Sequence, residues 1–498
     1  MKYVISAKKM QQTDKQFIEY IGIPSLVLME RAALGVTRWL LKRYCLDCCC
    51  IVVGTGNNGA DGLAIARQLV ERGIQPDIYI CGTIEKATKE FLTQYHILQQ
   101  LQVPFLERLE KKPYTVIVDA IFGVGLSREI QGSYYDVISL LNNWNTPIIS
   151  VDIPSGIDAT TGAVLGIAIK AKETITFGFW KRGLLLYPGA EYAGTVLLEG
   201  AGFHETQLLQ KDEEAFFYEP QDILLTLPKR SAWSNKGTYG TVLIIAGGEQ
   251  MAGAAYLSAY AAYRTGCGMV RMCTGRANRE SLLARLPELV LTTWSTKEEA
   301  KQLVASEWEK ADVVVFGPGM GRNETTKEML EWILKQQDRP IILDADALNV
   351  LSEQMDLLKQ TQASIIMTPH IKEFSRLYGV SVQHIQNNLF EEVIRFVNEY
   401  PVVCVAKDVR TIVAKRGEIA YINKSGNHGM ATAGAGDVLT GIIGGLLAQG
   451  MEEKEAAMLG VYLHGLAGDQ AKEKLGEYSM TASDIIQCLS DVLGGKKK

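Results

Sequence analysis

Short apolar runs alternate along the chain with longer segments in which apolar residues recur at helical spacing. In the first half of the chain, the apolar runs fall at residues 48–53, 77–81, 115–123, 147–158, 173–179 and 194–200. Each run is nearly continuous, which is typical of parallel strands that helices cover on both faces. A further helical segment, residues 24–44, precedes the first run. The pattern predicts an α/β domain with a doubly wound, three-layer arrangement.

The rhythm breaks between residues 203 and 236, where the sequence is polar and has no sustained period. It then restarts with apolar runs at residues 240–248, 268–275, 311–321, 339–348, 363–370 and 401–413. No repeat of fixed period relates the two halves. We therefore predict two different α/β domains, at residues 1–215 and 222–498, each with a site of its own.

Composition and charge exclude several classes of function. The 498 residues carry 56 acidic and 51 basic side chains, a net charge of −5, so we expect no nucleic acid partner. The N-terminal segment has no apolar core of the signal-peptide type, and no run of 18 apolar residues occurs, so we expect no membrane association. The nine scattered cysteines predict reduced core thiols and a cytoplasmic location. Adjacent cysteines at 48–50 point to opposite faces of a strand and cannot share a metal.

A G-x-G-x-x-G pattern at residues 54–59 stands between the first predicted strand and a helix. This pattern is found in dinucleotide-binding folds, in which an acidic residue at the end of the second strand holds a ribose. Here the second strand ends in Cys81 and Gly82, and its acid, Asp77, lies at its start. The sequence therefore argues against an oxidoreductase that uses NAD(P) for hydride transfer.

Three predicted strands of the first domain end in polar side chains. The first is followed by Asn57, Asn58 and Asp61, the third contains Asp119 and is followed by a glycine turn at 123–125, and the fourth contains Asp152, Ser155 and Asp158. Each group by itself is typical of a turn. Because the carboxyl ends of parallel strands meet at one edge of a sheet, the three together favour a binding site. Amide, carboxylate and hydroxyl oxygens suit a hard cation.

Four segments of the first domain closely resemble the NAD(P)H-hydrate epimerase family: LMERAA (28–33), GTGNNGADGLAIAR (54–67), VDAIFGVGL (118–126) and SVDIPSGIDATTG (150–162). The resemblance covers residues 1–215 and implies a Rossmann-like fold that binds a damaged nicotinamide nucleotide as substrate. It implies that potassium is bound by Asn58, Asp119 and Ser155. It implies substrate contacts from Asn57, Asn58, Gly59, Ala60, Asp61, Gly123, Val124, Gly125, Leu126, Ser127, Arg128, Glu129 and Asp152. We take Asp152 as the candidate acid–base residue.

The segment GMATAGAGDVLTGIIGGLLAQG, residues 429–450, carries the sharpest motif of the second domain. Gly434, Ala435 and Gly436 lead into a helix whose free N–H groups can hold a phosphate or an oxyanion. Asp437, in the first turn, can accept a proton from a hydroxyl that attacks phosphorus. The helix dipole at this position favours the ionised form of Asp437. The alternative is an ordinary glycine-rich helix start with a carboxylate at its N-terminus.

Together with GPGMG (317–321), LDADAL (343–348) and TPHIKEF (368–374), this motif resembles the ribokinase-like superfamily. More narrowly, KGTYGTVLIIAGG (236–248) and GAAYLSA (253–259) resemble the ADP-dependent NAD(P)H-hydrate dehydratase family, over residues 222–498. The resemblance implies ADP as co-substrate, Mg²⁺ at the site, and Asp437 as the catalytic base. It implies hydrate contacts from Ala254, Gly319, Gly321, His370 and Asp437, and nucleotide contacts from Lys407, Asp408, Val409, Arg410, Thr411 and Gly436.

Both domains in this order are similar to the bifunctional NAD(P)H-hydrate repair enzymes, which are isomerase and lyase in one chain. The resemblance implies that the substrates are the hydrates NADHX and NADPHX, and we expect a homo-oligomer. Two alternatives stay open at this point. A vitamin or sugar kinase fused to a nucleotide-binding domain would accumulate a phosphorylated product, and a non-catalytic sensor would bind pyridine nucleotides without turnover. The segment KDVRT (407–411) departs from the commoner Lys-Gly-Ala pattern, because Asp408 and Arg410 are larger.

Overall fold

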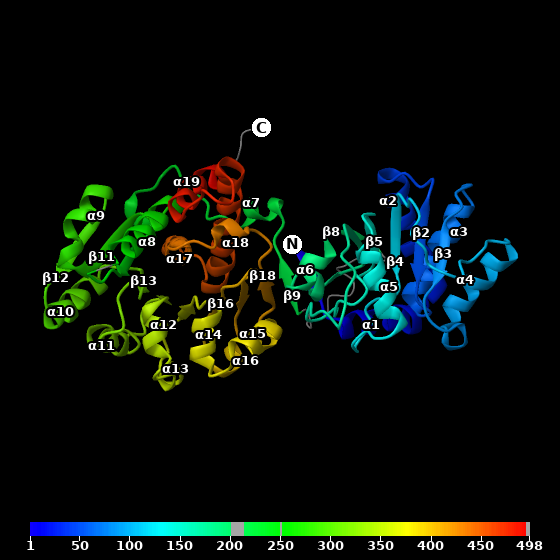
Figure 1. The fold of residues 1–498 in the computed structure, drawn as a ribbon. Helices are drawn as coiled ribbons and strands as arrows, with labels where there is room; N and C mark the ends of the chain where they lie inside the picture. The colour runs from blue at the N-terminus through cyan, green and yellow to red at the C-terminus, as the bar shows by residue number, and fades with distance from the viewer. Residues whose placement is uncertain (201–213, 250, 495–498) are drawn as a thin grey trace. The chain divides into compact units, whose positions relative to one another are not determined.

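The structure, a computed structural model, describes residues 1–200, 214–249 and 251–494. The chain divides into two compact units, Lys2–Ala215 and Phe216–Lys498, the second of which also includes Met1 (Figure 1). Part of the segment where the sequence rhythm breaks, residues 201–213, lies outside the described residues. The remainder of that segment contains short elements, among them β9 (Ala215–Phe217) and α7 (Ile223–Thr226). In the described part of the chain, no helix combines the length and the apolar character that crossing a membrane requires.

The first unit contains a parallel sheet with the strand order β3-β2-β4-β5-β6-β8. Its strands are β2 (Cys49–Val53), β3 (Asp77–Ile80), β4 (Val116–Ala120), β5 (Ile148–Val151), β6 (Glu173–Phe177) and β8 (Thr195–Glu199). All six predicted runs are confirmed as strands. Most strands are shorter than the predicted runs because the polar and glycine residues at the run ends form the turns that follow. The adjacent order of β2, β4 and β5 places the three polar strand ends at one edge.

Helices cover both faces of this sheet, as expected for a Rossmann-like unit. On one face, α2 (Ser25–Arg43), α3 (Asn57–Val70) and α4 (Lys89–Gln100) pack in one core, which includes Cys49. On the other face, α5 (Ser133–Asn142) packs in a second core, which includes Cys50. The expectation that neighbouring cysteines point to opposite faces is therefore confirmed, and all nine thiols are free.

The N-terminus forms elements that the apolar pattern does not predict. Strand β1 (Lys2–Ile5) pairs in parallel with the two-residue strand β7 (Trp180–Lys181), and Ile5 lies opposite Lys181. Helix α1 (Ala7–Lys15) follows and continues into a π-helical turn, η1 (Gln16–Ile21). Ser6 caps α1 by accepting a hydrogen bond from the Lys9 N–H. These elements are too short to give a recognisable period in the sequence.

The second unit has a longer sheet, in which strands run in the order β12-β11-β10-β13-β14-β15-β16-β17-β18. Their bounds are β10 (Thr241–Ile245), β11 (Met269–Gly275), β12 (Val290–Trp294), β13 (Val313–Phe316), β14 (Ile341–Leu343), β15 (Ile365–Met367), β16 (Val403–Ala406), β17 (Ile412–Ala414) and β18 (Ala420–Ile422). Pairing is parallel from β12 to β16 and antiparallel from β16 to β18. The predicted run 401–413 therefore contains two strands, and residues 407–411 form the turn between them.

Helices lie on both sides of this sheet as well (Figure 1). Their bounds are α8 (Ala252–Thr265), α9 (Arg279–Arg285), α10 (Lys297–Trp308), α11 (Glu324–Ile333), α12 (Asp346–Leu351), α13 (Asp356–Gln360), α14 (Ile371–Tyr378), α15 (Val382–Asn387), α16 (Leu389–Glu399), α17 (Ala435–Ala448), α18 (Glu453–Leu475) and α19 (Ala482–Leu493). Helix α17 packs closely on α8, because a Cβ on Gly441 would lie 2.1 Å from the Ser258 carbonyl oxygen. This contact, together with packing on β10 and β13, fixes α17 on the sheet.

Candidate active sites

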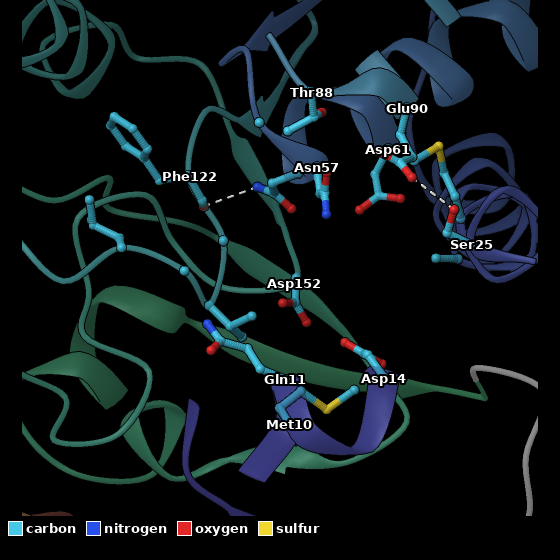
Figure 2. Close-up of a pocket in the computed structure, with 18 of the residues that line it drawn as sticks. Met10, Gln11, Asp14, Ser25, Asn57, Asp61, Thr88, Glu90, Phe122 and Asp152 are labelled. Carbon is cyan, nitrogen blue, oxygen red and sulfur yellow. Dashed lines mark hydrogen bonds between the residues drawn. The ribbon is translucent and has the colours of Figure 1, made fainter. Parts of the chain in front are cut away.

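A cavity of about 1140 Å³ opens at the carboxyl ends of β2, β4 and β5 in the first unit (Figure 2). Its walls come from α1, the starts of α2 and α3, the loop 121–128 and Lys181 of β7. Among the residues expected at the substrate, it is lined by Asn57, Asn58, Asp61, Gly123, Val124, Gly125, Leu126, Ser127, Arg128 and Asp152. The expected contacts Gly59, Ala60 and Glu129 are not among the lining residues. The structure thus brings together most of the predicted positions.

The glycines of the G-x-G-x-x-G pattern allow backbone segments to approach closely. A Cβ on Gly59 would lie 1.8 Å from the Gly54 carbonyl oxygen, and one on Gly54 would lie 2.1 Å from the Ile121 carbonyl oxygen. This packing sets the start of α3 at the end of β2. In the first turn of α3, the N–H groups of residues 57–59 have no backbone acceptor in the described part of the chain, because the first intrahelical bond is made by the Ala60 N–H. Such a helix start favours an anionic group.

The three side chains expected to bind potassium converge on the turn after β4. Asp119 is fully buried and accepts hydrogen bonds from the Ser155 hydroxyl at 2.5 Å and the Ser155 N–H at 2.9 Å. The Asn58 amide donates to the Phe122 carbonyl at 3.0 Å, and the Phe122 N–H donates to the Ser155 hydroxyl at 2.8 Å. Burial raises the pKa of Asp119 above its ordinary value, although these hydrogen bonds oppose the rise. A bound cation would offset that cost, so the donor set fits potassium.

Asp152 lies directly after β5 and pairs with a lysine that the sequence motifs did not indicate. Lys181 is buried, and its Nζ donates to the Asp152 carboxylate at 2.5 Å, to the Thr176 hydroxyl at 3.0 Å and to the Phe177 carbonyl at 2.8 Å. The φ of Asp152 is +68°, a conformation that costs energy for a residue other than glycine and is found preferentially at functional sites. Lys181 lies on a strand of two residues, too short for a sequence signal.

Two further carboxyl groups line the same cavity. Burial raises the pKa of Asp61 well above its ordinary value, and the charges of Asp152 and Asp14 raise it further. The pKa of Asp14 rises to about 6, also chiefly through burial. Figure 2 shows Asp14, Asp61 and Asp152 directed into one cavity. Asp14 stands on α1, outside every motif, and sequence reasoning missed it.

In the second unit, the glycine-rich motif forms the start of α17, as predicted. Gly434 is the N-cap residue, with φ +89°, and Asp437 stands in the first helical turn. The N–H groups of Gly436 and Asp437 have no backbone acceptor among the described residues. A Cβ on Gly436 would lie 3.2 Å from Lys407 Nζ. The helix start therefore presents free donors next to a cation, which suits a phosphoryl group.

Lys407 is the centre of a charged cluster at this helix start. Its Nζ lies 2.9 Å from the Asp344 carboxylate, which also accepts a hydrogen bond of 2.7 Å from the Thr440 hydroxyl on α17. Burial alone would lower the pKa of Lys407, but the carboxylates of Asp344, Glu373 and Asp437 raise it above its ordinary value. Asp344 lies inside the LDADAL motif. Its role as the partner of Lys407 was not predicted.

The helix dipole favours the ionised form of Asp437, but burial and neighbouring carboxylates act in the opposite direction. Burial raises the pKa of Asp437 to about 7, and the negative charge of Asp344 raises it further, while Lys407 lowers it. Desolvation and neighbouring carboxylates outweigh the dipole. A carboxyl with a pKa near neutrality is well matched to proton transfer, so this shift supports an acid–base role.

The remaining residues expected at the hydrate lie at neighbouring strand ends. Ala254, near the start of α8, is 3.0 Å from the position of a Cβ on Gly319. The Gly321 N–H donates to Asp346 at 2.8 Å. His370 is the N-cap of α14: its Nδ1 accepts from the N–H groups of residues 372 and 373, which leaves Nε2 as the site of the proton when the ring is neutral.

The segment expected at the adenine nucleotide contains half-buried and exposed positions. Lys407 faces the carboxylates described above, whereas 60 % of Val409 is exposed. Arg410 donates to the Lys424 carbonyl at 3.1 Å, and the Thr411 hydroxyl donates to the Asp408 carbonyl at 3.4 Å. The two larger residues are therefore accommodated in the turn between β16 and β17.

His464 on α18 is a further titratable group near this site that the sequence did not indicate. Its Nε2 is buried and has no hydrogen-bond partner among the described residues. Burial lowers the pKa of His464 to about 4, and the charge of Lys407 lowers it further, so the ring is neutral. Among the described residues, no group of three or more histidine, cysteine, aspartate or glutamate side chains is arranged to hold a metal ion.

The comparisons with known proteins agree with the division into two units. The sequence pattern of the NAD(P)H-hydrate dehydratase family matches residues 242–491, and the pattern described as YjeF-related protein N-terminus matches residues 25–183. A bifunctional NAD(P)H-hydrate repair enzyme of Coxiella burnetii is 35 % identical over 93 % of this chain and 94 % of its own length. The chain belongs to this family. The corresponding enzyme of Moorella thermoacetica is 33 % identical over 99 % of this chain and 96 % of its own length.

A solved structure supports the assignment of the second unit. The ADP/ATP-dependent NAD(P)H-hydrate dehydratase of Bacillus subtilis, crystallised with ATP and Mg²⁺, is 30 % identical. It matches 56 % of this chain and 97 % of its own, with a TM-score of 0.51. The expected α/β architecture, Rossmann-like in the first unit and ribokinase-like in the second, is confirmed. The expected membership of the chain among enzymes that combine an epimerase with a dehydratase is also confirmed.

Proposed function

We propose that this chain returns hydrated nicotinamide cofactors to NADH and NADPH by two reactions at two sites. The first unit would interconvert the R and S forms of NADHX and NADPHX, and the second would dehydrate the S form with ADP, giving AMP and phosphate. Two features of the same chain carry the proposal. One is a nucleotide-sized cavity in the first unit that contains Asp152, and the other is a helix start in the second unit that contains Asp437 and suits a phosphoryl group. Full-length similarity to the repair enzymes supports it.

In the first unit, we propose that Asn57, Asp61, Asp152 and the loop 123–129 contact the hydrate, with the free N–H groups of α3 at its phosphates. Gly59 and Ala60 would act through the backbone of this helix start. Asn58, Asp119 and Ser155 would hold potassium, whose charge would fix the turn after β4 that borders the cavity. The buried Asp119 carboxylate is the feature that supports a cation there.

In the second unit, we propose that Asp437 accepts the proton of the C6 hydroxyl as that oxygen attacks the β-phosphorus of ADP. AMP leaves, and loss of phosphate from C6 with a proton from C5 restores the ring double bond. The N–H groups at Gly436 and Asp437 would stabilise charge on the phosphoryl oxygens, a contribution of about 3–4 kcal/mol for one such donor. Lys407 lies where it can share that role.

We propose that the hydrate contacts Ala254, Gly319, Gly321 and His370, and that residues 407–411 with Gly436 contact the adenine nucleotide. Mg²⁺ would be held mainly by the phosphates of that nucleotide and would neutralise their charge. The neighbouring carboxylates, Asp344 and Asp346, fit such an ion because they stand at the end of β14 beside Asp437. We propose ADP as the co-substrate. The Bacillus subtilis relative, an ADP/ATP-dependent dehydratase, supports this choice.

One experiment separates this function from the alternative, a vitamin or sugar kinase. The purified chain is incubated with the mixed hydrate and ADP, and NADH, AMP and phosphate are measured together. Repair predicts equal amounts of all three products. A phosphorylated product that accumulates without NADH would favour the kinase. No reaction with any phosphoryl donor, with tight binding of the hydrate retained, would favour a sensor.

Assembly and location stay predictions. We propose a homo-oligomer, and exposed apolar side chains near the cavity support an interface there: Ile18, Tyr20, Ile21, Leu26 and Val27. Light scattering after size-exclusion chromatography would test it, and a monomer at all concentrations would contradict it. We propose a cytoplasmic location, which the nine free thiols support.

A further inference from the structure

The N-terminal helix α1 forms one wall of the first cavity. In the sequence, this helix precedes the segment that matches the family pattern, which begins at residue 25. The helix is held firmly at its start. The N–H and hydroxyl of Ser6 donate to the Glu214 carboxylate at 2.6 and 2.7 Å, and Ile5 pairs with Lys181. Asp14, the next-to-last residue of α1, lines the cavity. Helix α1 is therefore an anchored part of the cavity wall.

The Asp14 carboxyl is available to a ligand. Within the part of the chain that the structure describes, no group lies within hydrogen-bond or ion-pair distance of its oxygens. The charges that act on it most strongly are those of Lys181 and Asp152. Figure 2 shows the Asp14 carboxyl directed into the cavity that Asp152 also faces. A carboxyl without a protein partner inside a substrate-sized cavity is placed to meet a polar group of the substrate.

The charges in the cavity indicate which carboxyl groups carry protons. Lys181 is the cation whose charge lowers the pKa of both Asp14 and Asp61. Lys181 contacts Asp152 directly, so its charge is already engaged in an ion pair. Two more unpaired negative charges in the same partly desolvated space would be costly, which favours protons on Asp14 and Asp61. The pKa of Asp14, about 6, allows it to give and take a proton near neutrality.

We propose that Asp14 is a catalytic acid–base residue of the epimerisation. The inference rests on the proposed function of the first unit. In the forward step, the Asp14 carboxyl donates its proton to the C6 hydroxyl, and the C6–O bond breaks with its electron pair on the oxygen, so water leaves. The N1 lone pair forms a C6=N1 double bond. The resulting cation lies in a cavity that contains the Asp152 carboxylate, which stabilises it.

The return step completes the change of configuration. Water adds to the other face of C6, the C6=N1 electron pair returns to N1, and the proton lost by the water returns to the Asp14 carboxylate through a second water molecule in the cavity. One water leaves and one enters, so the reaction needs no oxidant, reductant or further reactant. Lys181 acts as a positioning residue, because its bonds to Asp152, Thr176 and Phe177 hold the carboxylate in place.

Asp14→Asn in the full chain tests the proposal. The epimerisation rate is measured as the conversion of R to S hydrate, after subtraction of the rate without protein, and dehydration of pure S hydrate is measured in parallel. We expect epimerisation to fall by about 10²–10⁴-fold and dehydration to stay unchanged. The matched control is Gln12→Ala on the exposed side of the same helix, which should keep both rates.

The outcomes separate this inference from the proposed function. A wild-type chain that does not epimerise the hydrate overturns the proposed function and the role of Asp14 with it. A wild-type chain that epimerises, with Asp14→Asn at a similar rate, overturns only the role of Asp14. If Asp14→Asn lowers the thermal stability of the first unit, the epimerisation rate of Asp14→Glu decides whether Asp14 acts as an acid–base group. A carboxyl at this position should recover part of the rate, and no recovery contradicts acid–base catalysis.

The pH profile adds a readout that a purely structural role would not change. The charged groups that line the cavity with Asp14 are Lys15 and Glu19 on its own segment, Lys181 on β7, Asp152 after β5, Asp61 on α3, Lys86, Glu90 on α4 and Arg128 in the loop 121–128. Because the protonated form donates, kcat/KM of the wild type should fall as pH rises through about 6. This limb should be absent in Asp14→Asn. The same limb in both proteins would show that another group of the cavity titrates.

Discussion

Replacing Asp437 by asparagine should remove the dehydratase activity and, at the same time, stabilise the second unit. Asparagine has nearly the same shape and cannot ionise. In the wild type, burial and the charge of Asp344 raise the pKa of Asp437 from 3.8 to about 7. The folded chain therefore binds a proton more tightly than the unfolded chain does. The carboxyl contributes progressively less stability as pH rises from about 4 to about 7.

The size of the effect follows from the shift. Each pKa unit corresponds to about 1.4 kcal/mol, so a shift of about three units destabilises the folded state by up to about 4 kcal/mol above pH 7. At pH 5 the effect is smaller, under about 2 kcal/mol, since the folded carboxyl there is already protonated. The loss of a general base should slow dehydration by about 10²–10⁴-fold.

The assay compares the wild type with Asp437→Asn. Thermal unfolding is measured for both proteins at pH 5 and pH 8, and the rate of dehydration of S hydrate is measured for both. At about 2 °C per kcal/mol, Asp437→Asn should raise the unfolding midpoint by up to about 8 °C at pH 8 and by under about 4 °C at pH 5. A lower midpoint at pH 8 would refute the reasoning about burial. Normal turnover, or turnover that recovers with extra Mg²⁺, would refute the role of Asp437 as base. Wild-type dehydration should also rise as pH passes about 7.

Three further predictions concern the first unit and the boundary. Epimerisation should be faster in potassium than in sodium buffer, and Asp119→Asn should remove the difference; equal rates in the two buffers would contradict a potassium site. Gly59→Ala places a Cβ 1.8 Å from the Gly54 carbonyl oxygen and should abolish epimerisation while dehydration persists, whereas a fully active variant would show that the backbone can move apart. Limited proteolysis should cut near residue 215 and leave two stable fragments, and continuous degradation without either fragment would argue against two separately folded domains.

The sequence predicted those parts of the fold that rest on long, regular patterns. The six strands of the first sheet are nearly continuous apolar runs because helices cover both faces, and such runs are visible without a structure. The antiparallel pair β17 and β18 could not be recognised in the sequence because each strand has only three residues. The same applies to β1 and β7, which set the position of Lys181.

The sites divide in the same way. Residues inside glycine-rich motifs, such as Asn58 and Asp437, could be predicted because a helix start needs glycines and polar side chains at fixed spacing. Asp14 and Lys181 could not, since each stands alone in its segment and meets Asp152 only through tertiary packing. The raised pKa of Asp437 could not be predicted, because the helix dipole is visible in the sequence whereas burial and the proximity of Asp344 are not.

The central claim is that one chain performs both steps of the repair. The most direct measurement follows NADH absorbance after ADP is added to pure R hydrate, with the wild type, Asp152→Asn, Asp437→Asn and an equal mixture of the two variants. The wild type should recover all of the NADH, each variant little beyond the rate without enzyme, and the mixture most of it. Full recovery by Asp152→Asn alone, or none by the wild type, would contradict the account.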